Sequence, residues 1–196
     1  VANSSVIGFG KAMSQSNTTH KIVPMLLSPL DAENYHDMIY DMKSFITAFK
    51  DAGFKTYYFS NQGRNGAIID GFGREADEVT FLRDTNPYAL DGELLPLLKK
   101  AVTDESPKKL IVLHTYGSHY SYFDRYPNWC HTFGEDTPRQ LMLIYREELI
   151  DNYDNSVLYT SHIIDQTIQT VGQDSIPSAV FYVGDHGEDI FDDERC

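Results

Sequence analysis

The stretch of sequence that decides the fold is KLIVLH, residues 109–114. Its four central residues are all apolar, and two of them are β-branched. A nearly continuous apolar run of this length is typical of a strand that is buried on both faces in a parallel sheet. The run ends at His114, so a side chain able to bind a metal or to transfer a proton stands at the end of this strand.

Helical and strand-like patterns alternate before this stretch. Apolar residues at helical spacing over 35–49 predict one helix, and Gly53 stands where a cap would end it. Residues 55–60, KTYYFS, predict a strand, and residues 90–102 predict a second helix. This alternation predicts an α/β fold with a mainly parallel sheet flanked by helices.

The pattern continues after the stretch. Thr137-Pro138 is a typical helix start, and helical periodicity runs over 141–171, with an expected break or bend at 152–155. Residues 178–183, SAVFYV, predict a last strand that runs into GDHG at 184–187. Two predicted strands thus carry His or Asp at their carboxyl ends, which is the edge where open parallel sheets bind ligands.

Composition sets broad limits on the function. A chain of 196 residues with 41% hydrophobic content can bury one core, so we expect residues 1–196 to form a single domain, part of a longer protein. The 29 acidic residues outnumber the 16 basic ones, and no Lys/Arg cluster is present that could follow a phosphate backbone. We therefore expect no nucleic-acid binding. No apolar run approaches the roughly 20 residues that span a bilayer.

The strongest local signal is VFYVGDHGE, residues 180–188. Asp185 and His186 can reach one ion only where the chain turns sharply, and the flanking glycines permit such a turn. A carboxylate oxygen with an imidazole nitrogen suits Zn²⁺ or Mn²⁺ better than Ca²⁺. The alternative is a loop in which Asp185 caps a following helix and His186 is merely exposed.

Two other segments carry residues that could do chemistry. His114 and His119 flank a loop with a central glycine, where either could bind a metal or donate a proton; a pair of surface histidines is the alternative. The segment SNTTHKIVPM, residues 16–25, places hydroxyls at the start of a predicted helix, where unpaired N–H groups favour a bound phosphate. Metal coordination would lower the pKa of such a hydroxyl enough for attack. An ordinary Ser/Thr N-cap is the alternative.

Taken in order along the chain, these segments resemble the alkaline phosphatase/sulfatase superfamily. Within it, they resemble the phosphoethanolamine transferases that modify bacterial lipid A and other envelope glycans. The resemblance covers almost the whole chain. It rests on residues 7–10 (IGFG), 17–20 (NTTH) with Pro24, 60–62 (SNQ), 113–119 (LHTYGSH), 153–156 (YDNS) and 185–188 (DHGE).

The resemblance implies a role for individual residues. Thr19 matches the threonine nucleophile, because it stands five residues before Pro24; Thr18 is a second candidate. Asp185 and His186 match ligands of the zinc ion that activates this threonine, so that Thr19 itself is also a metal ligand.

The same resemblance implies the groups that hold the substrate. His114 and His119 match histidines that contact the substrate phosphate or a second zinc ion, so that His119 is also a candidate metal ligand. Asn17 and Asn61 are candidates for polar contacts with the substrate. One or two zinc ions are therefore expected.

The chain departs from the family pattern at both ends. Family members have an upstream Gly-Glu-Ser motif, whose glutamate binds zinc, and a further histidine after the DHGE segment; both are expected outside this sequence, as are upstream membrane helices. The site within residues 1–196 is accordingly expected to be incomplete. Residues 14–26 lack the Cys/Ser-x-Pro-x-Arg motif of formylglycine sulfatases, which favours threonine-based phosphoryl transfer.

The implied reaction transfers phosphoethanolamine from phosphatidylethanolamine to lipid A or another envelope glycan through a phospho-threonine intermediate. The implied location is the periplasmic face of the bacterial inner membrane. Two alternatives stay open. One is a metal-dependent hydrolase or a glycerol-phosphate polymer synthase of the same superfamily; the other is a non-catalytic binding domain that keeps the fold.

Overall fold

Three parallel strands form the sheet of the computed structural model. They are β1 (Lys55–Ser60), β2 (Glu78–Phe81) and β3 (Lys109–His114), in the order β2-β1-β3. The register aligns the last residue of β1, Ser60, with the last residue of each neighbour. All three strands therefore end at one edge. The structure describes residues 6–64, 68–134, 146–173 and 176–191.

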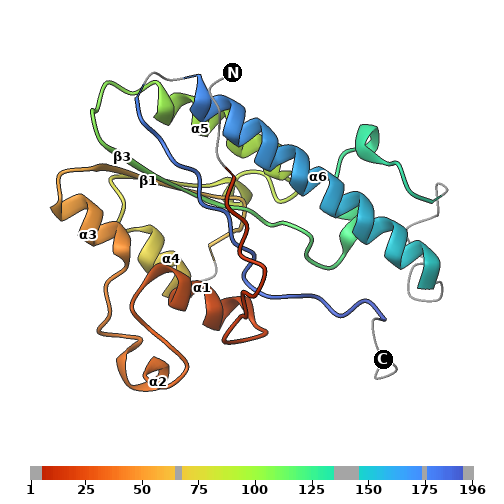
Figure 1. The fold of residues 1–196 in the computed structure, drawn as a ribbon, viewed down its shortest axis with the longest axis horizontal. Helices are drawn as coiled ribbons and strands as arrows, with labels where there is room; N and C mark the ends of the chain where they lie inside the picture. The colour runs from red at the N-terminus through yellow and green to blue at the C-terminus, as the bar shows by residue number, and fades with distance from the viewer. Residues whose placement is uncertain (1–5, 65–67, 135–145, 174–175, 192–196) are drawn as a thin grey trace.

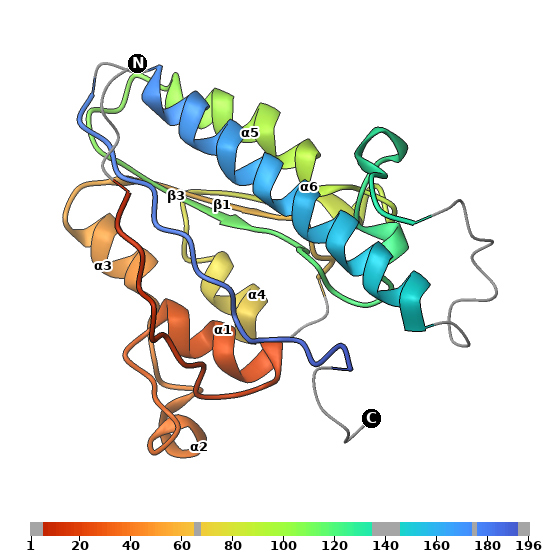
Figure 2. The same ribbon diagram turned by 45° about the vertical axis from the view of Figure 1, so that its right-hand side comes forward.

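Helices cover both faces of this sheet. Figures 1 and 2 show α5 and α6 together on one side and α1, α3 and α4 on the other. The predicted α/β fold, with a parallel sheet flanked by helices, is confirmed. The α-helices are α1 (Thr19–Leu27), α2 (Tyr35–Met38), α3 (Phe45–Asp51), α4 (Ile68–Gly73), α5 (Leu94–Val102) and α6 (Arg146–Gly172); 3₁₀ turns occupy η1 (Leu82–Asp84), η2 (Asp91–Glu93), η3 (Tyr122–Asp124) and η4 (Asn128–Cys130).

The central strand β1 supplies the core on both sides. Tyr58 belongs to the cluster with Ile46 of α3, whereas Tyr57 and Phe59 pack with Leu94 of α5. Period-two alternation along the strand sends these side chains to opposite faces. β3, predicted to be buried on both faces, is half-buried along its length because it is an edge strand of the described sheet.

The single helix predicted over residues 35–49 is wrong. The structure has two shorter helices, α2 and α3, separated by residues 39–44. Ser44 is extended and its side chain accepts a hydrogen bond from the N–H of Ile46, so it starts a new helix. Gly53 ends α3 with a φ of +83°, and its N–H donates to Lys50 O, which confirms the predicted cap.

The predicted break at residues 152–155 is absent, because α6 runs as one helix through them. The predicted start at Thr137-Pro138 lies outside the described residues.

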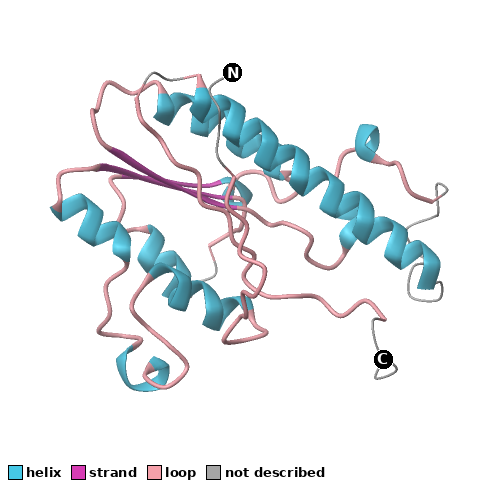
Figure 3. Cartoon of the chain, viewed as in Figure 1, coloured by secondary structure: helices cyan, strands magenta, loops and turns pink. Residues whose placement is uncertain are grey.

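The strand predicted over 178–183 is also wrong. This segment is extended but joins no strand of the described sheet (Figure 3), and Phe181 is 78% exposed. An apolar run becomes a strand only where a neighbour completes its hydrogen bonds.

No helix within the described ranges is both long and apolar enough to cross a membrane. α6 is the longest of them, and its composition explains the finding. The 27 residues of α6 alternate between charged, polar and apolar side chains, with Tyr159 and Ile163 buried and many others exposed. One face of α6 thus packs on the molecule while the other meets water.

Asn155 anchors α6 to the loop that precedes it. This asparagine is fully buried, and its Oδ1 accepts hydrogen bonds from the N–H groups of Thr132 at 2.7 Å and Phe133 at 3.0 Å. Its Nδ2 donates to Phe133 O at 2.9 Å. The side chain thereby replaces main-chain partners that this loop would otherwise lack, which explains why an amide stands at this position.

We expect Asn155→Ala to lower the free energy of unfolding by about 2–4 kcal/mol, because it removes three hydrogen bonds made by a fully buried side chain. Urea denaturation of the purified protein measures this change. The exposed Asn128 is a matched control, and Asn128→Ala should change the stability by less than about 0.5 kcal/mol. Equal effects of the two variants would contradict the anchoring role of Asn155.

Candidate active site

The edge where the strands end carries His114. Its Nδ1 lies 2.9 Å from the hydroxyl of Tyr58 and 3.0 Å from Oγ of Ser60. The Ser60 hydroxyl also accepts a hydrogen bond from the Gln62 N–H. One ring nitrogen of His114 is therefore fixed by two hydroxyls from the adjacent strand, which sets the orientation of the imidazole.

The surroundings of His114 favour its neutral form. Burial lowers the pKa of this imidazole, and the charges of Asp185, Asp91 and Asp70 act in the opposite direction, raising it. The net pKa is below the ordinary histidine value. A neutral imidazole can bind a metal, which is one of the two uses predicted for His114. The other predicted use, proton donation, needs the protonated form that burial disfavours.

Thr19 and His186 meet although 167 residues separate them. Thr19 Oγ1 lies 3.3 Å from His186 Nε2. Thr18, not Thr19, is the N-cap of α1, and its side chain makes no cap hydrogen bond. The Thr18 hydroxyl instead lies 3.1 Å from the Ser16 hydroxyl. The capping alternative therefore does not account for Thr19, whose hydroxyl is left to face the Asp185-His186 segment.

His186 is oriented as metal-binding histidines commonly are. Its Nδ1 lies 2.8 Å from Gly187 O, and a carbonyl can only accept, so Nδ1 carries the proton. Nε2 is then the basic nitrogen, and it faces both Thr19 and the Asp185 carboxylate, whose Oδ2 is 3.5 Å away. A main-chain carbonyl that fixes the tautomer in this way is a common outer contact of zinc-bound histidine.

The donor atoms fit a zinc ion. Donors around a four-coordinate zinc, each about 2.0–2.2 Å from the ion, lie roughly 3.3–3.6 Å from one another. The separations of 3.3 Å from His186 to Thr19 and 3.5 Å from His186 to Asp185 match this spacing. No group of three or more His, Cys, Asp or Glu within the described ranges is arranged to hold a metal. Two such residues and a hydroxyl are therefore what this part of the chain brings together.

Two contacts from distant loops hold the DHGE segment. The Ser14 hydroxyl donates to Asp185 O at 2.7 Å, and the buried Tyr122 hydroxyl donates to Glu188 Oε1 at 2.9 Å. Residues 186–191 contain no helix, so the alternative in which Asp185 caps a following helix is wrong. The segment is held by side-chain contacts and not by a helix or a sheet.

The other predicted residues lie apart from this cluster. His119 is exposed, with Nδ1 2.6 Å from Tyr120 O, and the structure describes no contact between it and Thr19 or the Asp185-His186 pair. Asn17 is exposed. Asn61 is buried and donates to Ala89 O at 3.2 Å, so its described contacts are internal. The predicted substrate contacts of these residues stay predictions.

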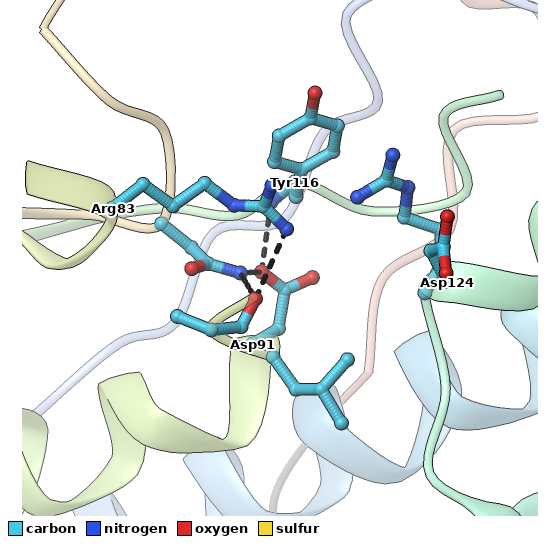
Figure 4. A pocket seen from close by; sticks show the side chains of 8 residues that line it. Arg83, Asp91, Tyr116 and Asp124 are labelled. Atoms are coloured by element: carbon cyan, nitrogen blue, oxygen red, sulfur yellow. Dashed lines mark hydrogen bonds between the residues drawn. The ribbon is translucent and has the colours of Figure 1, made fainter. Parts of the chain in front are cut away.

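Asp91 is a site residue that the sequence did not reveal. Its buried carboxylate accepts hydrogen bonds from Asn61 Nδ2 at 2.8 Å, the Tyr116 N–H at 2.8 Å and the Gly117 N–H at 2.9 Å (Figure 4). It therefore fixes the loop that joins His114 to His119. In the sequence, an aspartate at the start of a predicted helix looks like a capping residue, so no signal distinguishes it.

Comparison with known proteins gives this arrangement a family. The sequence model of the family described as "Sulfatase" matches residues 2–195. The chain belongs to the sulfatase family. Among curated relatives of this sulfatase domain, the phosphoethanolamine transferase EptC of Escherichia coli K12 is 28% identical over 193 residues, which cover 94% of this chain and 33% of EptC. EptA of the same strain is 26% identical over 200 residues, covering 97% of this chain and 36% of EptA.

The chain thus spans about a third of the length of these relatives.

Solved structures of similar proteins have the same fold. The crystal structure of the C-terminal periplasmic domain of E. coli EptC in complex with Zn has a TM-score of 0.69 at 25% identity, and covers 80% of this chain and 46% of that chain. The integral membrane EptA of Neisseria meningitidis has a TM-score of 0.72 at 22% identity, covering 84% and 32%, and supports the fold alone.

The lowered pKa of His114 predicts how stability depends on pH. Between the folded pKa and the unfolded value of about 6.5, the unfolded chain binds a proton at this histidine and the folded protein does not. The free energy of unfolding should therefore fall as the pH falls below about 6.5. Urea denaturation at pH 7.5 and 5.5 should show a larger loss for the parent than for His114→Gln. Equal losses in the two proteins would contradict this origin.

Proposed function

We propose that this chain is part of the catalytic domain of a zinc-dependent transferase that moves phosphoethanolamine from phosphatidylethanolamine to lipid A or another envelope glycan. One observation carries the proposal: Thr19 Oγ1 lies 3.3 Å from His186 Nε2, on the side of His186 that Asp185 also faces. A hydroxyl, an imidazole and a carboxylate converge there from opposite ends of the chain. The names of the relatives EptC and EptA supply the group transferred.

The first step is attack by Thr19 on the phosphodiester. Asp185, His186 and Thr19 would hold a zinc ion, which when bound would supply positive charge that lowers the pKa of the hydroxyl and offsets the charge of the phosphate. Thr19 Oγ1 gives its proton to solvent water and forms a bond to phosphorus, while the bond from phosphorus to the diacylglycerol oxygen breaks. The exposed His119 donates a proton to the leaving oxygen, and the neutral His114 holds a non-bridging oxygen.

The second step releases Thr19. A sugar hydroxyl, or a phosphate oxygen of lipid A, forms the new bond to phosphorus, and the bond to Thr19 Oγ1 breaks. The acceptor loses a proton in this step, and His114 suits its removal because burial keeps the imidazole neutral. His119 stands at the far end of the same loop and is exposed, so it is placed to meet a large substrate that arrives from solvent.

The proposed setting is the periplasmic face of the bacterial inner membrane, with a phospholipid donor and a glycolipid acceptor. The similar structure of E. coli EptC supports it, because that structure is a C-terminal periplasmic domain. One zinc ion is proposed at Thr19, Asp185 and His186. A second is proposed as an alternative, with His114 and His119 as its candidate ligands, because these histidines are not among the donors grouped around His186.

Incubation of the full-length protein with phosphatidylethanolamine should leave a phosphoethanolamine group on Thr19, because the hydroxyl is the nucleophile. Mass spectrometry of the digested protein detects this adduct. Thr19→Ala should abolish both the adduct and at least about 99% of transfer, as loss of an activated nucleophile does. Thr18→Ala is the matched control, since it removes the neighbouring hydroxyl and should keep most activity.

Active protein with an unmodified Thr19 would overturn the proposed mechanism. The fate of the group decides between the reactions: phosphoethanolamine on the glycan supports the transferase, while release to water alone would make the protein a hydrolase.

Tyr122→Phe should weaken zinc binding by about tenfold or more, because loss of its hydroxyl frees Glu188 and with it the adjacent His186. The zinc dissociation constant of the full-length protein, measured by competition with a chelator, tests this. Tyr120→Phe is the control: it removes a hydroxyl from a more exposed tyrosine on the same loop and should leave the constant unchanged. Equal zinc affinity in Tyr122→Phe and the parent would contradict the positioning role.

A further inference from the structure

Two arginines stack on one tyrosine beside the proposed active site. The guanidinium carbons of Arg83 and Arg125 lie 4.1 Å and 3.9 Å from the ring centre of Tyr116. One ring face has room for a single guanidinium at this distance, so the two lie on opposite faces. Figure 4 shows Arg83 reaching Tyr116 above the buried Asp91. Because arginine stays ionised, this arrangement holds two positive charges close together.

The guanidinium groups are poorly matched with acceptors. Arg83 donates to Ala89 O at 3.1 Å, while its buried Nε has no partner in the part of the chain that the structure describes. Arg125 donates to His119 O at 2.9 Å and Tyr120 O at 3.4 Å. All these acceptors are neutral main-chain carbonyls. Each guanidinium therefore keeps terminal N–H groups that have no acceptor among the described residues.

No described carboxylate forms an ion pair with either arginine. Asp91 is close, but its two oxygens already accept three hydrogen bonds from the Asn61 side chain and the loop main chain. Arg83, Arg125 and Asp124 line one small hollow. Asp124 is exposed, so water screens its charge. Burial is the main cause of a lowered pKa at Arg125; the charge of Arg83 also lowers it, while Tyr116, Asp124 and Asp91 raise it. The positive charge here is only partly balanced.

This cluster lies at the same edge of the sheet as the proposed reaction site. Tyr116 belongs to the loop between His114 and His119, and the charges of Asp91 and Asp185 both act on His114. Burial raises the pKa of Tyr182, and the charges of the same two aspartates raise it further. The arginine cluster and the metal-binding pair therefore flank one histidine, which places the cluster beside the reacting groups.

We propose that Arg83 and Arg125 form a binding site for a phosphate group carried by the acceptor. The hollow that they line has no room for a whole phosphate, so their free N–H groups would meet it at the mouth of the hollow. Guanidinium suits phosphate because its planar N–H groups donate in pairs. The identity of the acceptor rests on the proposed function: the phospholipid donor has one phosphate, which reacts at Thr19, so a second phosphate belongs to the acceptor.

The first test is direct binding of inorganic phosphate to the full-length protein, followed by isothermal titration calorimetry. Arg83→Gln and Arg125→Gln should each weaken phosphate binding at least tenfold relative to the parent. Arg74→Gln is the matched control, because it removes the same charge from an exposed arginine outside the hollow. Equal phosphate affinity in the parent and both site variants, or an equal loss in Arg74→Gln, would overturn the site.

A second measurement needs no variant and so avoids any failure to fold. Phenylglyoxal modifies arginine side chains, and mass spectrometry of the labelled parent protein locates the modified residues. Phosphate should slow the labelling of Arg83 and Arg125 at least severalfold and leave that of Arg74 unchanged. Labelling that is insensitive to phosphate at both residues would contradict the proposal.

Kinetics then separate the acceptor from the donor. Arg83→Gln should form the Thr19 adduct at the parent rate, while its KM for a phosphorylated acceptor rises about tenfold and its KM for the dephosphorylated acceptor is unchanged. Slower adduct formation with an unchanged acceptor KM would overturn the assignment to the acceptor. If the parent forms no adduct at all, the proposed function fails, whereas the phosphate titration and the labelling still decide whether the site exists.

Discussion

The buried carboxylate of Asp91 is the contact on which the arrangement of the site depends. It accepts a hydrogen bond from Asn61, the residue that follows β1. It also accepts hydrogen bonds from the N–H groups of Tyr116 and Gly117, in the loop that follows β3. The adjacent Gly92 N–H donates to the Tyr159 hydroxyl of α6 at 3.0 Å. One short turn therefore ties two strand ends to the long helix, and a buried charge with three donors is stable where an unpaired one would not be.

The parts of the fold that the sequence predicts well are those whose signal is local. β1 and β3 span the predicted residues because aromatic or aliphatic side chains fill consecutive central positions, Tyr57 to Phe59 in β1 and Leu110 to Leu113 in β3. β2 and α4 are short, and they were not predicted. The helix expected over 35–49 fails for a different reason: Ser44 Oγ donates to Glu75 at 2.6 Å, a contact 31 residues away that spacing on one helix face does not reveal.

The site likewise contains residues that the sequence marks and residues that it does not. Asp185 and His186 are recognisable because glycines flank them, and Thr19 because it stands five residues before Pro24, as the family resemblance requires. Their meeting across 167 residues is a tertiary fact that follows from motif order in a family and not from any spacing within the sequence. Asp91 and Arg83 carry no such local mark. Their importance depends on main-chain groups and a ring contributed by another loop, which no pattern in residues 82–93 predicts.

The strand predicted before Asp185 shows how little of the site depends on regular structure. Residues 178–183 pair with no described strand, yet His186 has a fixed tautomer and lies within contact distance of Thr19. The geometry must then come from contacts at the segment itself, namely the hydroxyls of Ser14 and Tyr122. These two residues lie on loops from different parts of the chain, so the position of Asp185 and His186 depends on the packing of both loops. A site of this kind responds to changes in the loops more strongly than one held within a sheet, because each loop supplies a single hydrogen bond where a sheet would supply several.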